Sequence, residues 1–131
     1  MNPLEISVTM PHGHPMLLVD AACEGVEAGS AIAFKNITFN EPCFRCAEGA
    51  VSLRQLAYPL ALLVESFGQG AGLLLAQRGF LAGARSDAVV VFGEFRDIEI
   101  VGDAYPGDRL CHEVQIDLWA PIIEASGVSA G

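Results

Sequence analysis

Cationic side chains are scarce in this sequence, and their scarcity excludes several classes of partner. Lys35 is the single lysine among 131 residues, scattered arginines supply the other cations, and the formal net charge is −9. A nucleic-acid-binding surface needs clustered lysines and arginines to neutralise phosphates. An anionic membrane surface repels a chain of this charge. We therefore expect neither nucleic acid nor a membrane as a partner.

The sequence also lacks the segments that divide or target a chain. It has no Pro/Ser-rich linker, no internal repeat, and no N-terminal basic region followed by the apolar run of a secretory signal. Its length suits one domain, and 52% hydrophobic residues supply ample apolar surface for one core. We predict a single domain over residues 1–131, located in the cytoplasm.

Cysteine is too sparse for a metal site or a disulfide framework. Among the four cysteines, Cys43 and Cys46 form one C-x-x-C pair. A structural zinc site needs two further ligands at suitable spacing, and no second pair is present. Cytoplasmic thiols stay reduced by default. We therefore predict free thiols and no metal.

Hydrophobic patterning predicts an α+β domain built around one long helix. The helix begins at Pro59, because proline is tolerated at the first helical position, and ends near Arg78, before Gly79. It is apolar on almost all sides, which indicates a buried helix. A sheet wrapped around it satisfies this pattern. The predicted antiparallel strands cover residues 16–26, 31–39, 88–100 and 109–119, with a final piece at 122–130.

Two polar residues interrupt this apolar helix. Glu65 and Gln69 are four apart, so they lie on one helical face, and they argue against a membrane-spanning segment. A carboxyl group in apolar surroundings favours its protonated form and can act as a general acid. Spacing alone also allows a buried glutamate that is satisfied by Gln69 or by the backbone. Gly68 and Gly72 share a face and indicate the close approach of a strand or a partner helix.

Three further segments form a pattern that covers most of residues 10–118. The first reads MPHGHPMLLVD and continues to KNITFNEPCF, the second reads PLALLVESFGQGAG, and the third reads YPGDRLCHEVQI. In this order they resemble the opening, the central helix and the P-G-D turn of the (3R)-hydroxyacyl-ACP dehydratases of fatty-acid synthesis. The resemblance implies a hotdog fold, in which a curved antiparallel sheet wraps a long helix. It also implies dimers whose active sites lie at the subunit interface.

The same resemblance implies a reaction. In that family a loop histidine removes a proton from C2 of an acyl thioester, and a helix carboxylate of the other subunit protonates the departing 3-hydroxyl. Glu65 falls on that carboxylate, with Gln69 in support, and substrate contacts are implied at Phe44, Pro59 and Leu60. Backbone N–H groups near Leu60 would polarise the thioester carbonyl. The acyl group would arrive on the phosphopantetheine of acyl carrier protein or on coenzyme A, with no other cofactor.

The family's loop histidine is missing from this chain. Counting from the N-E-P segment, Ala47 stands at its position, and alanine cannot accept a proton. The loop that leads to the helix is also longer than in the family. His12 matches a family histidine of the N-terminal segment, where we expect a structural role, and His14 stands where the family often has an aromatic residue. His112 lies on the apolar face of a strand, where we expect a core residue. Glu48 is a weak base for a carbon-bound proton.

Three interpretations of this departure are open. The chain could pair with a histidine-bearing hotdog homologue, so that one interface site of a heterodimer in fatty-acid or polyketide biosynthesis combines the partner's histidine with Glu65. It could instead be a hotdog thioesterase in which Glu65 activates water. It could also be a non-catalytic acyl-binding or scaffold subunit. A homodimer is the alternative to the heterodimer. The family continues for one more strand, so we expect either a shortened sheet or a trimmed C-terminus here.

Overall fold

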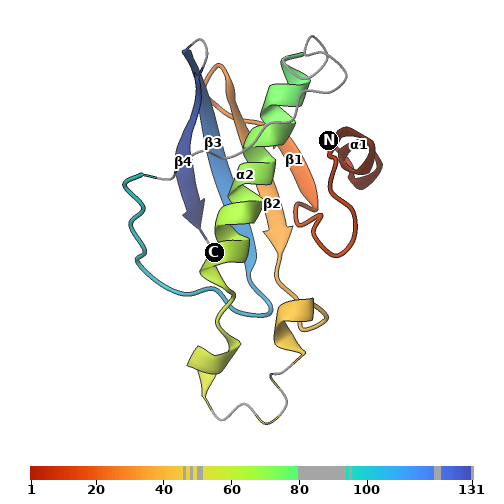
Figure 1. The fold of residues 1–131 in the computed structure, drawn as a ribbon, viewed down its shortest axis with the longest axis vertical. Coiled ribbons are helices and arrows are strands. Elements are labelled where there is room, and N and C mark those ends of the chain that lie inside the picture. The colour runs from red at the N-terminus through yellow and green to blue at the C-terminus, as the bar shows by residue number, and fades with distance from the viewer. Residues whose placement is uncertain are drawn as a thin grey trace.

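A four-stranded antiparallel sheet and one long helix organise the computed structural model of the chain (Figure 1). The structure describes residues 1–45, 47, 49, 52–79, 94, 96–119 and 122–130, with only the backbone for 118–119 and 122–130. The sheet has the order β1-β2-β3-β4, and its strands are β1 (Ala21–Glu24), β2 (Ser30–Asn36), β3 (Arg109–Trp119) and β4 (Ile122–Ala130). The long helix crosses one face of this sheet. The predicted α+β class is confirmed.

Helix α2 (Leu60–Gln77) has the predicted boundaries. Pro59 is its N-cap residue, and Gly79 follows with φ of +77°, a left-handed conformation that favours glycine and ends the helix. The inner face of α2 packs on β2 and β3. By length and composition α2, together with the turn before it, could cross a membrane, yet its buried side chains pack on this sheet and on the N-terminal residues.

The helix and the sheet approach each other most closely at Gly70. A Cβ atom added to Gly70 would lie 2.9 Å from Cβ of Ala33 and 3.4 Å from Cγ2 of Val114. A Cβ atom added to Gly72 would lie 3.6 Å from Cε of Met10, an ordinary contact distance. The close approach that we predicted at Gly68 and Gly72 is therefore misplaced, because the tight contact lies at Gly70 and Gly72 makes only an ordinary contact.

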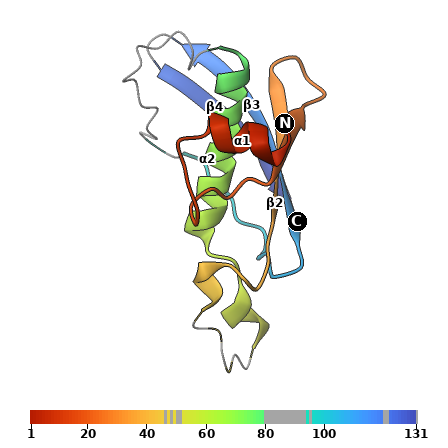
Figure 2. The ribbon, with the colours of Figure 1, turned by 90° about the vertical axis from the view of Figure 1, so that its right-hand side faces the viewer.

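The N-terminal residues form a helix that the sequence prediction missed. Helix α1 (Pro3–Thr9) begins with a capping box, in which Asn2 and Glu5 exchange side-chain to backbone hydrogen bonds. Ile6 is buried in a cluster that also contains Met10 and Leu73, so α1 covers the side of α2 (Figure 2). This packing brings the segment after α1 against the middle of α2.

The predicted strands are correct in part. Residues 109–119 form β3 as predicted, with alternate residues buried: Leu110, His112, Val114 and Ile116. The first predicted strand, 16–26, is longer than β1, because the N–H of Leu18 donates to the side chain of Gln69 and not to a neighbouring strand. The second predicted strand, 31–39, corresponds to β2, which ends at Asn36. Of the predicted strand 88–100, residues 88–93 and 95 lie outside the described residues, and residues 94 and 96–100 form no strand.

The long connection between β2 and α2 contains two short 3₁₀ helices. The first, η1, is Pro42–Phe44, and the second, η2, is Leu53–Leu56. Both lie beyond the sheet, at the N-terminal end of α2 (Figures 1 and 2). The connection therefore covers the start of the helix.

Substituting Gly70 and Gly72 separately tests the close helix-to-sheet contact. Alanine is the better helix former by about 1 kcal/mol, so Gly72→Ala should raise the free energy of unfolding. Gly70→Ala forces Ala33 or the helix to shift, which costs about 1–3 kcal/mol and should leave it less stable than Gly72→Ala. Urea unfolding followed by circular dichroism measures both variants. Equal stability of the two variants would contradict the assigned contact.

Candidate functional site

Glu65 lies in the middle of α2 and makes its contacts through one carboxylate oxygen. Its Oε1 accepts a hydrogen bond of 2.9 Å from Nε2 of Gln69, and Nε2 of His12 lies 3.4 Å from the same oxygen. The Glu65 side chain is 27% exposed. Of the alternatives that the spacing left open, a fully buried glutamate is therefore excluded, because the sheet packs on another side of α2. A partly exposed carboxyl group can exchange a proton with a bound molecule.

Gln69 connects this carboxylate to the N-terminal segment. It is only 1% exposed, and its amide reaches three partners. Nε2 donates to the carbonyl of Met16 (2.7 Å) as well as to Glu65, and Oε1 accepts from the N–H of Leu18 (2.8 Å). A buried amide needs such partners, because an unpaired one loses about 1–3 kcal/mol. The supporting position predicted for Gln69 beside Glu65 agrees with this geometry.

His12 joins this cluster, although the sequence indicated only a structural role for it. Its side chain is 34% exposed, while its Nδ1 is buried without a hydrogen-bond partner among the described residues. Sequence reasoning missed this contact because His12 and Glu65 come from distant segments. The only available signal was the resemblance of both segments to one family. His14, two residues later, is exposed.

The remaining predicted site residues lie around the start of α2. Ala47 and Phe44 pack in one apolar cluster with Tyr58, and the N–H of Ala47 donates to the carbonyl of Phe44 (2.9 Å). Pro59 and Leu60 are exposed, and Leu60 begins the helix. The first N–H groups of a helix have no acceptor within the helix, so they can polarise a carbonyl oxygen. The predicted candidate base Glu48 lies outside the described residues.

The structure thus brings some predicted residues together and separates others. Glu65, Gln69 and His12 form one cluster, whereas Ala47 and Phe44 belong to the apolar cluster at the start of the helix. Among the described residues, no contact joins Glu65 to Ala47 within this chain.

Tyr58 is a buried polar residue that the sequence did not single out. Its hydroxyl has no hydrogen-bond partner among the described residues, and burial raises the pKa of the phenol. Its ring packs against Phe44 with centroids 6.4 Å apart. A neutral phenol that holds its proton cannot act as the missing base.

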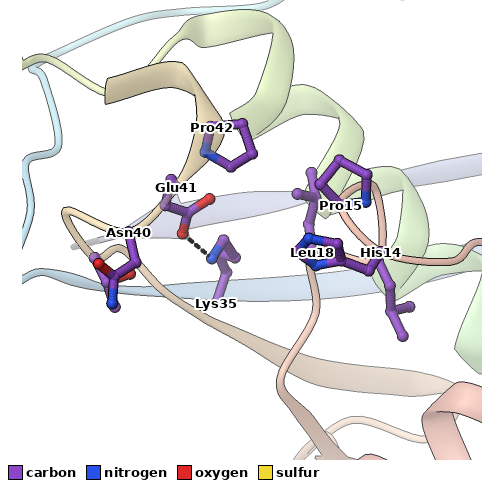
Figure 3. Close-up of a pocket in the computed structure, with 9 residues that line it drawn as sticks. His14, Pro15, Leu18, Lys35, Asn40, Glu41 and Pro42 are labelled. Atoms are coloured by element: carbon purple, nitrogen blue, oxygen red, sulfur yellow. Dashed lines mark hydrogen bonds and ion pairs between the residues drawn. The ribbon is translucent and has the colours of Figure 1, made fainter. Parts of the chain in front are cut away.

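A small cavity lies between the N-terminal segment and the loop after β2. Its volume is about 160 Å³, and His14 and Pro15 face Asn40 and Pro42 across it (Figure 3). Lys35 forms an ion pair with Glu41 here and donates to the carbonyl of Asn36 (2.6 Å), and both charged side chains are more than nine-tenths buried. The lone lysine is thus neutralised by Glu41 and orders the loop.

His112 is a core residue, as predicted. It and Ser66 are fully buried, and Nε2 of His112 lies 2.8 Å from Oγ of Ser66. Because Ser66 donates its own hydrogen to the carbonyl of Leu63 (2.9 Å), its Oγ accepts from the imidazole. Burial lowers the pKa of His112 to about 4. The imidazole is neutral near pH 7, and this buried hydrogen-bonded pair cannot reach a substrate.

The described cysteines are free thiols. Cys23 is exposed, Cys43 and Cys111 are partly buried, and burial raises the pKa of both latter thiols. A raised pKa leaves a thiol in its less reactive protonated form. Cys46, the second residue of the C-x-x-C pair, lies outside the described residues. The prediction that its thiol is free therefore stays a prediction.

Comparisons with known proteins agree with the fold and with the predicted family. A family model described as FabA-like domain matches residues 10–127. The protein named 3-hydroxyacyl-[acyl-carrier-protein] dehydratase FabZ of Pseudothermotoga lettingae is 36% identical over 114 residues, which cover 87% of this chain and 74% of that protein. The protein of the same name in Coxiella burnetii (strain RSA 331 / Henzerling II) is 32% identical over 116 residues, which cover 88% of this chain and 78% of that protein. The protein of the same name in Actinobacillus pleuropneumoniae serotype 5b is 32% identical over 114 residues, which cover 85% of this chain and 68% of that protein.

The buried imidazole of His112 predicts a pH-dependent stability. Its pKa is about 4 in the folded chain, and an unfolded histidine has a pKa near 6.5. Between these values the unfolded chain binds more protons, so this contribution is complete above about pH 6.5 and is lost as the pH falls towards 4. The loss from this group is about 3 kcal/mol.

Urea unfolding of the wild type and of His112→Gln between pH 7 and pH 4 measures this contribution. As the pH falls from 7 to 4, the free energy of unfolding should decrease more for the wild type than for His112→Gln. His14→Gln is the matched control, because it makes the same substitution at an exposed position outside the core. Parallel slopes for His112→Gln and the wild type would mean that His112 does not titrate as described.

Proposed function

This chain belongs to the family of FabA-like domains, and from that membership we propose that it is a 3-hydroxyacyl-ACP dehydratase-like subunit of fatty-acid or polyketide biosynthesis. In this proposal Glu65 is the general acid of an active site at a subunit interface. The names of the curated relatives support the reaction class. The observation that carries the proposal is the partly exposed Glu65, whose Oε1 is held by neighbours within the chain.

The proposed reaction needs one proton donor and one proton acceptor. The acceptor removes a proton from C2 of the 3-hydroxyacyl thioester, and the electrons of that C–H bond form the C2–C3 double bond. The C3–O bond breaks, and Glu65 gives its proton to the departing hydroxyl, which leaves as water. Transfer of the abstracted proton back to the Glu65 carboxylate restores both groups. N–H groups in the first turn of α2 polarise the thioester carbonyl.

We assign the proton acceptor to a histidine of a homologous partner chain. Ala47 stands at the position where the family pattern has this histidine, and its methyl group packs among apolar residues. His112 is buried, and His12 is directed at Glu65. A heterodimer would contain one interface site with both groups and one without the base. This division explains how a chain can keep an acid without its base.

The charge of the chain supports a division of labour in substrate delivery. Acyl carrier proteins are acidic, and a subunit of net charge −9 repels them. We therefore assign the docking surface for acyl carrier protein to the partner chain, and we place the complex in the cytoplasm. The phosphopantetheine arm of the carrier, or coenzyme A, presents the acyl group, and no metal or other cofactor takes part in the proposed reaction.

The apolar surroundings of Ala47 also favour a second function. A non-catalytic hotdog subunit that binds an acyl chain or stabilises an assembly would need apolar side chains there and no base. Glu65 would then have no catalytic role, so its replacement would leave the activity of the assembled complex unchanged. A hotdog thioesterase is distinguished by its product, because it would release free acid from the thioester.

Restoring the base tests the proposed function within this chain. Ala47→His should give the purified protein dehydratase activity, while the wild type alone should show none. Adding Glu65→Gln to Ala47→His should reduce the rate by about 10²–10⁴-fold, the usual contribution of general acid–base catalysis. Ala47→Gln is the matched control, because it adds bulk without a base. The measurement is ultraviolet absorbance of the 2-enoyl thioester formed from a 3-hydroxyacyl thioester.

Reconstitution with a histidine-bearing homologue tests the assignment of the partner. The mixed complex should dehydrate the thioester, and Glu65→Gln in this chain should lower the rate by the same factor. Replacing the homologue's own helix carboxylate should have little effect, because that group faces Ala47. Full activity of the wild-type chain alone would overturn the proposal, since it would place a base within this chain.

A further inference from the structure

Glu65 is contacted on one oxygen only in the part of the chain that the structure describes. Nε2 of Gln69 at 2.9 Å and Nε2 of His12 at 3.4 Å both approach Oε1. The contacts that the structure gives for Glu65 therefore leave Oε2 to a bound molecule. An amide nitrogen is a donor only, so Oε1 must be an acceptor towards Gln69. When Glu65 is protonated, its proton consequently belongs on Oε2.

The imidazole of His12 reinforces this choice of oxygen. Its Nδ1 is buried and has no hydrogen-bond partner among the described residues. Either neutral tautomer leaves Nδ1 buried without a partner, so the contact at Nε2 decides between them. The tautomer with its hydrogen on Nε2 places a protonated nitrogen, and not a lone pair, 3.4 Å from the acceptor Oε1. His12 and Gln69 thus present two N–H groups to the same carboxyl oxygen.

The N-terminal segment holds His12 in this place from both sides. Met10 is buried in the core cluster of α1 and α2, beside Gly72. Met16 and Leu18 are tied by their backbone to the amide of Gln69. His12 lies between these anchors, so its approach to Glu65 follows from the path of the chain.

We propose that His12 is a positioning residue, which fixes the carboxyl group of Glu65 so that its transferable proton is on Oε2, towards the substrate. This inference rests on the proposed function, because it assumes that Glu65 is the general acid. His12 is not the missing base, since its Nε2 faces Glu65 and the lone pair of Nδ1 is buried. The sequence pattern alone gave His12 no such role.

Nuclear magnetic resonance of the imidazole nitrogens tests the contact without any activity. In the purified wild-type chain, His12 should show a protonated Nε2 and a bare Nδ1. Glu65→Leu, which removes the acceptor, should shift the Nε2 resonance of His12, and it should leave that of the exposed His14 unchanged. A protonated Nδ1, or an unshifted His12 signal in Glu65→Leu, would overturn the inference.

Kinetics in the Ala47→His protein, or in the reconstituted complex, test the consequence. His12→Ala should lower kcat about tenfold with little change in KM, because substrate binding is kept while the acid loses its orientation. His12→Gln should recover much of kcat, since its amide can direct an N–H group at Oε1. His14→Ala is the matched control and should match the parent. Equal kcat for His12→Ala and His14→Ala would overturn the positioning role.

The two sets of measurements separate this inference from the proposed function. If neither the Ala47→His protein nor the reconstituted complex dehydrates a thioester, the proposed function fails, and with it the catalytic role of His12. The resonance measurement then still decides whether the His12–Glu65 contact exists. If activity depends on Glu65 but not on His12, the proposed function stands and the positioning role is wrong.

Discussion

The buried amide of Gln69 is the interaction on which the candidate site depends. It bonds to the backbone of Met16 and Leu18 on one side and to the carboxylate of Glu65 on the other. A different side chain at this position would leave buried backbone groups unpaired and release the N-terminal segment from α2. The same amide therefore orders the fold near His12 and binds Oε1, the oxygen of Glu65 that His12 also approaches.

Buried polar groups elsewhere in the molecule serve the fold and not the chemistry. His112 and Ser66 pair between the sheet and α2, where burial keeps the imidazole neutral. Lys35 and Glu41 form a buried ion pair that fixes the loop after β2. Each of these groups has its partner within the chain, so none is left to bind a substrate. Glu65 differs, because part of its carboxyl group stays accessible.

Under the proposed function, the chain keeps the acidic part of a two-group reaction and has an apolar residue, Ala47, at the basic position. In a site shared between two subunits these groups come from different chains, so the loss of one does not remove the other. Ala47 packs in the apolar cluster at the start of α2, whereas Glu65 contacts Gln69 and His12. Under the proposed function, this separation lets two related chains divide one reaction between them.

Local pattern predicted the long helix, its ends at Pro59 and Gly79, strand β3 and the alignment of Glu65 with Gln69. These features depend on neighbours a few residues away, so spacing along the sequence determines them. Helix α1, the shortened β1 and the tight contact at Gly70 were missed or misplaced. Each arises from packing between segments that are distant in the sequence.

The sequence by itself determined that a carboxylate lies on an apolar helix and that Ala47 cannot accept a proton. Only the tertiary structure decided that His12 meets Glu65, that Gln69 is bound to the N-terminal segment, and that both of these residues contact the same carboxylate oxygen. The physical reason is that a helix fixes which of its own residues share a face, whereas side-chain contacts between distant segments exist only after the chain has packed.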